Sequence, residues 1–354
     1  MIDLKKHLRE LSETPGASGY EARIRDVIGR AWADLVDEQT TDALGSLIAT
    51  KHGAGREPRK KVLVTAHMDE IALIVTGIED GFIRVEAIGG IDKRVLLSQP
   101  VIVHGERDLP GVIGSRPPHV LPASARNQYL PLEDLVVDTG LGSRGVAKLV
   151  RVGDIVTFDQ PAVELNKGYL SGKAMDNRVS VAMLTLMLQE LQTRSHQWDV
   201  IAAATVQEEV TLGGGETVAW RIQPDIAIVV DTTWGTGSGV GEDKGFPLGD
   251  GPTLVIGPNA HPKLFDLIME HARTLEIKVT PEPMPRSSGT EGWAVQVSRD
   301  GVPTAILSIP IRNMHSPVEV VALRDIERAA RLVADFLSTL DDGTLGKLAL
   351  DGEV

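Results

Sequence analysis

Residues 198–210 read WDVIAAATVQEEV, an apolar run that leads directly into two adjacent glutamates. The run from Trp198 to Val206 is short and almost wholly apolar, as in a strand that is buried on both faces of a parallel sheet. A chain that leaves such a strand enters the crevice at the carboxyl edge of the sheet, where α/β proteins bind ligands. We therefore expect Glu208 and Glu209 at that edge. Because neighbouring side chains leave an extended chain in opposite directions, we expect the two carboxylates to point apart.

Helix-like and strand-like segments alternate before residue 70 and after residue 166. This alternation predicts an α/β fold with a mostly parallel sheet that is flanked by helices. The expected helices span residues 2–13, 20–37, 179–191, 213–221, 262–275 and 323–340, and the expected strands span 44–50, 61–66, 198–206, 225–230 and 303–309.

Between residues 70 and 165 the sequence changes to short β-type runs separated by Gly and Pro. Two of these runs, 71–78 and 82–88, are joined by Glu79-Asp80-Gly81, which is a hairpin signal. Short strands without a long amphipathic helix are typical of a small β-barrel or sandwich. The chain of 354 residues also exceeds the length of about 250–300 residues at which single cores stop growing. We therefore expect an α/β domain of residues 1–69 and 166–354, with a β domain inserted at 70–165.

The composition limits the partners of the protein. The net charge is −13, so neither nucleic acid nor an anionic membrane is an expected partner, since both require a basic surface. The chain has no cysteine, which excludes disulfides and thiolate metal sites. The N-terminus lacks the apolar stretch of a secretion signal, and no apolar run reaches the roughly 20 residues of a membrane helix. These features predict a cytoplasmic protein.

Ionisable residues follow four of the predicted strands and begin one predicted helix. They are His67 and Asp69, Glu208 and Glu209, Asp231, His315, and Asp176 at the helix start. Two histidines with several carboxylates and no cysteine suit Zn²⁺, Co²⁺ or Mn²⁺. Many acids in one crevice are costly without cations, and two ions that share a bridging carboxylate need about five protein ligands. We therefore predict a two-metal site, with Asp69 placed to orient His67.

Each residue taken alone has a simpler interpretation. Asp176 could be a helix N-cap, Asp231 a turn or helix cap, and His67 a structural histidine. The pair Glu208-Glu209 could lie in a solvated loop. These alternatives lose weight because all of the residues fall at one edge of one predicted sheet.

With these residues in place, the chain resembles the M42 family of metallo-aminopeptidases, of the tetrahedral aminopeptidase type. The resemblance covers nearly the whole chain. It rests on PGASGYE (15–21), VTAHMDEIAL (64–73), GVIGSRPPHVL (111–121), GKAMDNR (172–178), TVQEEVTLGG (205–214), DTT (231–233) and SSGTEGWAVQVSRDGVPTAILSIPIRNMHSPVEVV (287–321). It implies a dinuclear-zinc exopeptidase-like fold and a hydrolase that releases N-terminal residues from short peptides with a two-metal activated water.

The resemblance also implies a role for each site residue. Two divalent ions, Zn²⁺ or Co²⁺, would share Asp176, with His67 and Asp231 completing one site and Glu209 and His315 the other. Glu208 would be the general base and Asp69 the partner of His67. The inserted β domain would make the contacts of a dimer, and dimers would assemble into a hollow tetrahedral dodecamer.

The sequence departs from the family pattern at Ala72, where a glycine is usual, and at Glu291, where an aspartate is usual. The second departure leaves the preferred N-terminal residue open. Three alternatives remain: another dinuclear amidohydrolase such as a deacylase or carboxypeptidase, a scaffold without activity, and a polysaccharide hydrolase. The last would need two carboxylates flanking a sugar and would leave His67 and His315 without a role.

Overall fold

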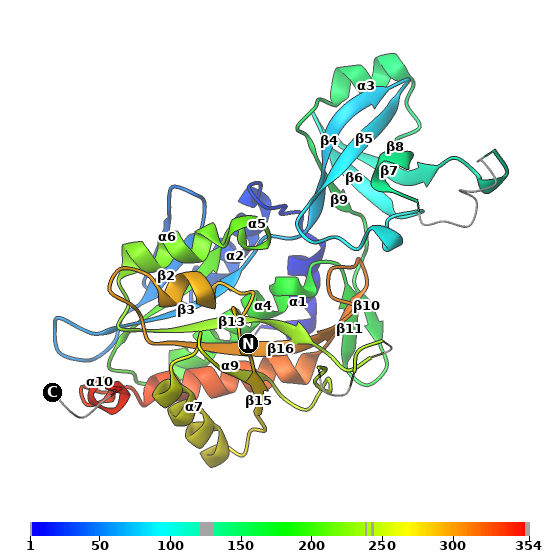
Figure 1. Ribbon diagram of the computed structural model, residues 1–354. Coiled ribbons are helices and arrows are strands. Elements are labelled where there is room, and N and C mark those ends of the chain that lie inside the picture. Colours follow the sequence, from blue (N-terminus) through cyan, green and yellow to red (C-terminus); the bar gives the residue numbers. More distant parts are fainter. Residues whose placement is uncertain (1, 121–129, 238, 242–243, 351–354) are drawn as a thin grey trace.

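The computed structural model describes residues 2–120, 130–237, 239–241 and 244–350, and the larger part of it is a mixed sheet covered by helices on both faces (Figure 1). In order of pairing, its described strands are β1 (Glu38–Thr41), β2 (Leu47–Lys51), β12 (Asp199–Thr205), β3 (Lys61–His67), β13 (Ile226–Trp234), β16 (Thr304–Arg312), β17 (Glu319–Ala322), β11 (Tyr169–Gly172) and β10 (Val163–Leu165), with β14 (Thr253–Ile256) and β15 (Thr280–Pro283) paired beside β16.

The centre of this sheet is parallel and its flanks are antiparallel. Strands β12, β3, β13 and β16 run in one direction, whereas β1, β2, β17, β11 and β10 pair antiparallel with their neighbours. The prediction of a mostly parallel sheet is therefore correct for the four central strands and wrong for the flanks. The edge strands β1 and β10 are exposed, so they leave no apolar run in the sequence by which they could be predicted.

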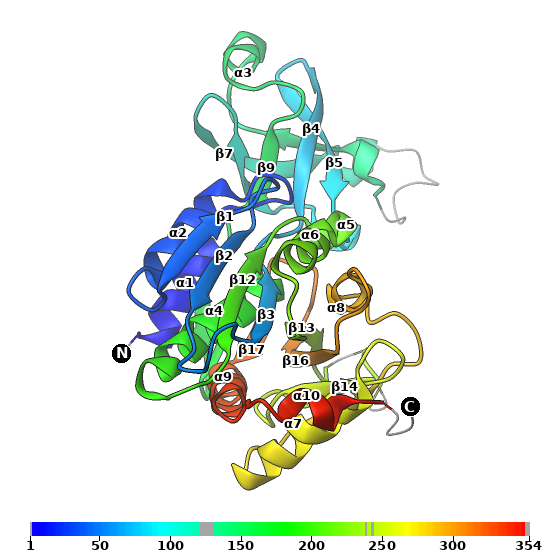
Figure 2. The ribbon, with the colours of Figure 1, turned by 90° about the vertical axis from the view of Figure 1, so that its left-hand side faces the viewer.

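Helices pack against both faces of the sheet (Figure 2). The α-helices among the described residues are α1 (Leu4–Glu13), α2 (Ala22–Trp32), α3 (Ser143–Leu149), α4 (Met175–Glu190), α5 (Glu208–Thr211), α6 (Gly213–Ile222), α7 (Pro262–Thr274), α8 (Gly292–Gln296), α9 (Leu323–Ser338) and α10 (Thr344–Leu348). Helices α1, α2, α4 and α9 share one core with the sheet, and α6 and α8 close the opposite face. None of the described helices is long and apolar enough to cross a membrane.

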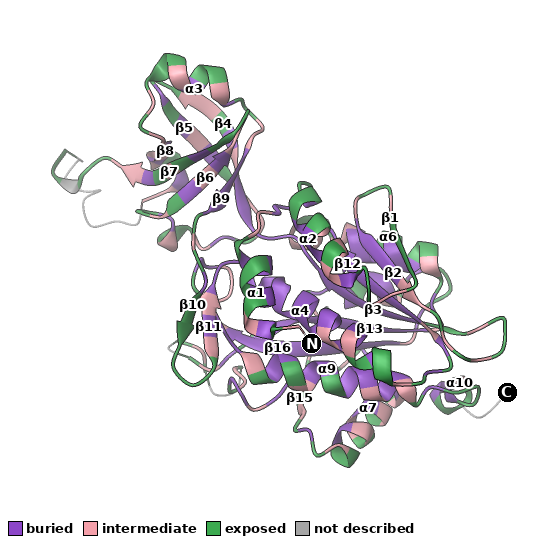
Figure 3. Ribbon diagram, turned by 180° about the vertical axis from the view of Figure 1, so that it is seen from behind, coloured by how far each residue is buried: buried purple, intermediate pink, exposed green. Residues whose placement is uncertain are grey.

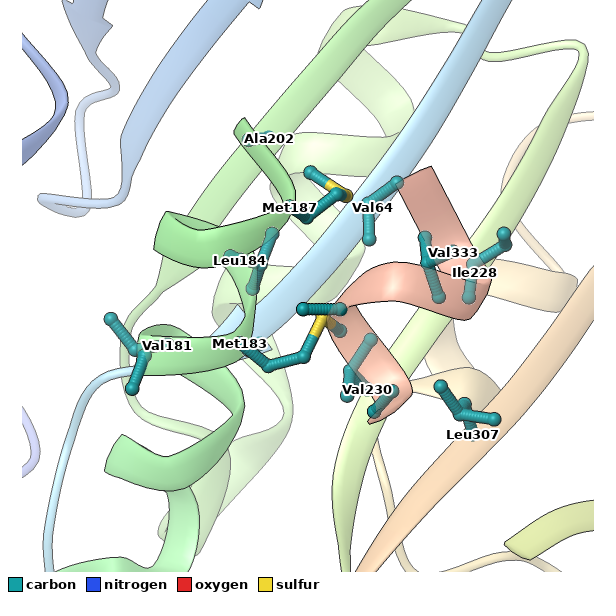
Figure 4. Packing of buried hydrophobic residues seen from close by; sticks show 14 of the residues in the cluster. Val64, Val181, Met183, Leu184, Met187, Ala202, Ile228, Val230, Leu307 and Val333 are labelled. Atoms are coloured by element: carbon teal, nitrogen blue, oxygen red, sulfur yellow. The ribbon is translucent and has the colours of Figure 1, made fainter. Parts of the chain in front are cut away.

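The main core lies between the sheet and helices α4 and α9. Figure 4 shows Val64 of β3 next to Met187 of α4, and Ile228 of β13 next to Val333 of α9. Successive strand residues face opposite sides, so Leu63 belongs to the core under α6 and α8 instead. Burying one such side chain contributes about 1.5–3 kcal/mol. The central strands are buried along their length (Figure 3), and they form a rigid platform for the residues at their ends.

The inserted segment forms a closed barrel with its own core, beside the carboxyl end of β3 (Figure 1). Its strands, in order around the barrel, are β4 (Ala72–Glu79), β5 (Phe82–Ile88), β8 (Leu135–Asp138), β7 (Asp108–Ser115), β6 (Pro100–His104) and β9 (Ile155–Phe158). The predicted hairpin joins β4 to β5, with positive φ angles of 52° at Asp80 and 91° at Gly81, as a tight hairpin turn requires. Strand β10, which follows the barrel, pairs with β11 in the large sheet.

Candidate metal centre

The predicted site residues converge at the carboxyl edge of the central strands. Six of them line one cavity of about 410 Å³: His67, Asp176, Glu208, Glu209, Asp231 and His315. The seventh, Asp69, is fully buried behind His67. Gly90, which follows β5, also lines this cavity, so the barrel domain contributes to its wall.

The carboxylate of Asp176 lies between the two histidines. Its Oδ1 is 3.3 Å from Nε2 of His67, and its Oδ2 is 3.5 Å from Nε2 of His315. Oε2 of Glu209 is also 3.5 Å from Nε2 of His315, and Oδ1 of Asp231 is 3.7 Å from Nε2 of His67. Two atoms bonded to one tetrahedral ion at about 2.1 Å lie roughly 3.4 Å apart. The spacing of these side chains therefore fits metal coordination.

Two buried atoms of the cluster, Oδ1 of Asp176 and Nδ1 of His67, have no hydrogen-bond partner among the residues that the structure describes. Buried polar atoms in proteins are nearly always satisfied, so an atom without a partner points to a missing ligand or a second interaction. Nδ1 of His67 is 3.4 Å from Asp69. Asp176 has non-helical backbone angles (φ −76°, ψ 104°) at the start of α4, as a helix N-cap does, but its carboxylate is directed at His67 and His315. A cation beside Asp176 would satisfy Oδ1.

The electrostatics of the cavity also favour a cation. Burial, together with the charges of Asp231, Glu209 and Asp176, raises the pKa of Glu208 to about 10. Burial and the charge of Asp176 raise the pKa of Glu209 to about 7, and burial raises that of Asp231 well above its usual value. The contact with Asp176 raises the pKa of His315 to about 9. The raised pKa values show that ionising all of these carboxyl groups together is unfavourable without added positive charge, which divalent cations would supply.

The two neighbouring glutamates face the same cavity, so the expectation that they point apart was wrong. Strand β12 ends at Thr205, and Gln207 takes up a left-handed conformation (φ 58°) that turns the chain into the short helix α5. Glu208 and Glu209 therefore project from a helical turn and not from an extended chain. They still approach different partners, because Glu208 Oε2 lies 3.8 Å from Nε2 of His67 whereas Glu209 lies next to His315.

Asp69 holds the turn that carries both glutamates. Its Oδ1 accepts a hydrogen bond from the backbone N–H of Glu208 (3.0 Å), and its Oδ2 accepts from the N–H of Glu209 (3.2 Å) and from Oγ of Ser18 (2.6 Å). Burial alone would raise the pKa of Asp69, but its contacts with His67, Ser18 and Glu208 outweigh burial and lower it. One carboxylate thus positions parts of both predicted metal sites. The contact from Ser18 was not predicted.

Glu319 is a second residue that sequence reasoning missed. Its Oε1 accepts from the backbone N–H of His315 (2.7 Å) and its Oε2 from that of Asp176 (3.0 Å). It is buried in β17 next to two valines. A glutamate inside such an apolar run is the one sequence feature that could have indicated a buried, functional carboxylate at this position. Nδ1 of His315 lies 2.9 Å from the carbonyl of Gly90. That contact directs Nε2 toward the cluster, as the outer contacts of metal-binding histidines do.

Asp231 lies within a strand and not after one. Strand β13 continues to Trp234 because its pairing with β16 extends that far, with Trp234 opposite Ile311. The sequence predicted the end at residue 230, since the polar residues Asp231, Thr232 and Thr233 interrupt the apolar run. The alternative interpretation of Asp231 as a turn or cap residue is therefore wrong.

The two departures from the family pattern do not line the cavity. Ala72 is buried at the start of β4, in a small cluster with Ala17 and Ile155. Glu291 is buried beneath the sheet edge, where its Oε2 accepts a hydrogen bond from Oγ1 of Thr65 (2.9 Å). The side chains of both residues point into the protein.

A family model described as M42 glutamyl aminopeptidase matches residues 45–332. The chain belongs to the M42 peptidase family. This M42 peptidase is 36% identical over 343 residues to a lysyl aminopeptidase from Pyrococcus furiosus, an alignment that covers 94% of this chain and 96% of the relative. It superposes with a TM-score of 0.92 on a TET aminopeptidase from Thaumarchaeota archaeon SCGC AB-539-E09 (29% identity, 98% and 100% of the two chains). It also superposes with a TM-score of 0.84 on the TET1 peptidase of Pyrococcus horikoshii (33% identity, 96% and 100%).

The M42 peptidase is a metal-dependent aminopeptidase, a hydrolase of peptide bonds. The alternatives of a deacylase, a carboxypeptidase, an inactive scaffold or a polysaccharide hydrolase are not favoured by these relatives. The cavity holds two groups of side chains that could each bind a metal ion, which agrees with metal dependence. One group is His67, Glu208 and Asp231, and the other is His67, Asp176 and Glu209.

Proposed function

We propose that this M42 peptidase removes N-terminal residues from short peptides with two divalent ions, which share the carboxylate of Asp176. His67 and Asp231 would complete one site, and Glu209 and His315 the other. The observation that carries this proposal is the placement of Asp176, whose two oxygens lie 3.3 and 3.5 Å from the Nε2 atoms of the two histidines. A fold of the dinuclear-zinc exopeptidase type, with the site at the carboxyl edge of a central parallel sheet, is part of this proposal.

In this proposal Glu208 is the general base. Two ions in the site would lower the pKa of a bound water toward neutrality and polarise the scissile carbonyl. The ions would also offset the neighbouring carboxylates that raise the pKa of Glu208. Glu208, ionised in their presence, would take the proton of the attacking water and pass it to the leaving amine. Asp69 keeps Glu208 in place through the backbone N–H of the turn and orients His67 from behind. Zn²⁺ or Co²⁺ is the proposed metal, because the donors are imidazole nitrogens and carboxylate oxygens without thiolates.

We also propose a homo-oligomer in the cytoplasm. The TET1 peptidase of Pyrococcus horikoshii is described as assembling into a tetrahedron or a large octahedral shell. By resemblance to the M42 family, the inserted domain of residues 70–165 would make the contacts between the two subunits of a dimer, and dimers would assemble into a dodecamer. Val112 and Val152 of the barrel are 52% and 67% exposed, which supports a contact surface there. The net charge of −13 supports the absence of nucleic acid and membrane partners. A monomer in solution by light scattering would contradict the assembly.

Metal removal combined with a substrate panel tests the proposed function. Dialysis against a chelator should abolish cleavage of aminoacyl arylamides, and Zn²⁺ or Co²⁺ should restore it. N-acyl amino acids and peptides with a blocked N-terminus should remain uncleaved in the same samples. Cleavage of the blocked substrates at a comparable rate, or full activity after complete metal removal, would refute the proposal.

A further inference from the structure

Besides the candidate ligands, the cavity is lined by Leu212, by Thr290 and by a part formed from the end of β13 and the residue after β15. Thr233, Trp234 and Met284 form this part. Among the residues that the structure describes, no lysine or arginine lines the cavity. A substrate whose scissile carbonyl lies at the candidate ligands must place its N-terminal side chain in adjoining space, and this part of the cavity adjoins Asp231 along the same strand.

Glu282 of β15 lies directly behind this wall. It is 5% exposed. Its Oε1 accepts a hydrogen bond from Oγ1 of Thr233 (2.6 Å), and its Oε2 accepts from Oγ1 of Thr253 (2.5 Å). Burial raises the pKa of Glu282, and the hydroxyl donors oppose that rise. Two hydroxyl groups that donate to the two oxygens are the arrangement of an ionised carboxylate.

The contact with Glu282 determines what Thr233 can offer a ligand. A hydroxyl group has one hydrogen and two lone pairs, and the hydrogen of Thr233 is directed at Glu282. Toward the cavity Thr233 can then act only as an acceptor. An ammonium or guanidinium group would donate to that acceptor and gain from the negative charge behind it. A carboxylate would meet lone pairs and a like charge, which is unfavourable in a partly buried site.

Two divalent ions at the metal centre would leave the charge of Glu282 unbalanced. Six carboxylates already lie at or behind that centre: Asp176, Glu208, Glu209 and Asp231 line the cavity, and Asp69 and Glu319 lie behind it. Glu282 forms no ion pair with any residue in the described part of the chain, and its side-chain hydrogen bonds are to hydroxyl groups. Arg286, on the loop between β15 and α8, is exposed and does not line the cavity.

We propose that Glu282, acting through the hydroxyl of Thr233, selects basic N-terminal residues, so that lysyl and arginyl peptides are preferred and glutamyl and aspartyl peptides are rejected. This inference rests on the proposed aminopeptidase function and names its substrate class. Glu282 is a specificity-determining residue in this account and not a catalytic one.

A panel of aminoacyl p-nitroanilides tests the inference on the metal-loaded wild-type protein. We expect kcat/KM for the lysyl and arginyl substrates to exceed that for the glutamyl substrate by roughly 100-fold, since a hydrogen bond to a charged group contributes on this scale. In Glu282→Gln, the ratio of lysyl to leucyl kcat/KM should fall about tenfold or more, and Thr233→Val should lower the same ratio. Glu164→Gln is the matched control, because it makes the same change in a carboxylate of β10 that is paired with Lys5 and does not line the cavity, and it should keep the ratio within about threefold. Thr253→Val should lower the ratio as Thr233→Val does, because Thr253 donates a hydrogen bond to Glu282.

Binding of the product amino acids gives a readout that does not depend on turnover. Isothermal titration should show tighter binding of L-lysine than of L-glutamate to the wild-type protein, and Glu282→Gln should reduce that difference. Two results would overturn this inference while leaving the aminopeptidase function intact. One is that the wild-type protein cleaves the glutamyl substrate as well as the lysyl substrate. The other is that Arg286→Ala loses activity toward the glutamyl substrate. Failure to cleave any aminoacyl arylamide with Zn²⁺ or Co²⁺ present would overturn the proposed function and this inference together.

Discussion

Replacing Asp69 with asparagine should weaken metal binding and catalysis without removing a proposed ligand. The carboxylate accepts from three donors, Ser18 and the N–H groups of Glu208 and Glu209, at 2.6–3.2 Å, and it backs His67 at 3.4 Å. Asparagine has one oxygen, so its NH2 group must face at least one of these donors. Loss of one hydrogen bond to a charged group costs about 1.5–3 kcal/mol, which corresponds to roughly 10–150-fold in an equilibrium or rate constant. Outer contacts of metal ligands typically contribute about 10–100-fold.

The assay for Asp69→Asn measures two constants on the same preparation. Competition with a chelator gives the metal dissociation constant, which should rise about 10–100-fold, and turnover of a leucyl or lysyl arylamide should fall on the same scale. Asp108→Asn is a suitable control, because Asp108 is a paired carboxylate in the barrel that does not line the cavity. If Asp69→Asn changed both constants by less than about twofold while the control behaved like the wild type, the reasoning about Asp69 would be refuted.

Two further predictions concern stability. Lys173→Met should lower the free energy of unfolding by about 3–5 kcal/mol in urea denaturation, because it leaves Glu70 buried without the ammonium that now lies 2.6 Å away; a loss below about 1 kcal/mol would contradict this. The paired contacts with Arg23 lower the pKa of Asp108 to about 2. This ion pair between α2 and β7 therefore stabilises the fold at pH values above the ordinary aspartate pKa of about 3.9. Its contribution to stability is lost as the pH falls toward 2. Because both side chains are about half exposed, we expect the ion pair to contribute only about 0.2–1 kcal/mol to the free energy of unfolding. Arg23→Met should then lose less stability between pH 5 and pH 2 than the wild type does. An equal loss in the two proteins would argue against this contribution.

The strand-end residues of the site could be predicted because their positions depend on local pattern and sheet topology. His67 ends an apolar run, and His315 follows one closely. Parallel neighbours then bring their carboxyl ends to one edge, as the pairing of Thr205 with His67 shows. The barrel could be predicted for a similar reason, since Asp80 and Gly81 are residues that tolerate the positive φ of a tight turn.

The contacts that position the ligands could not be predicted, since they join segments far apart in the chain. Ser18 reaches Asp69 across 51 positions, and Glu319 reaches Asp176 across 143. Local sequence patterns do not predict contacts between residues that lie so far apart in the chain. The direction of Glu209 depended on one backbone angle at Gln207, and a residue other than glycine in the left-handed region leaves little trace in sequence. Exposed edge strands likewise lack the alternation on which strand prediction depends.

The proposed mechanism depends on separate roles for Glu208, the general base, and Glu209, a metal ligand. Elemental analysis of Glu208→Gln and Glu209→Gln, combined with turnover of an aminoacyl arylamide, distinguishes these roles. We expect Glu208→Gln to keep two metal ions per subunit and to lose roughly 100-fold or more in kcat, whereas Glu209→Gln should lose bound metal. Glu208→Gln with reduced metal content, or with near-normal turnover, would contradict these roles.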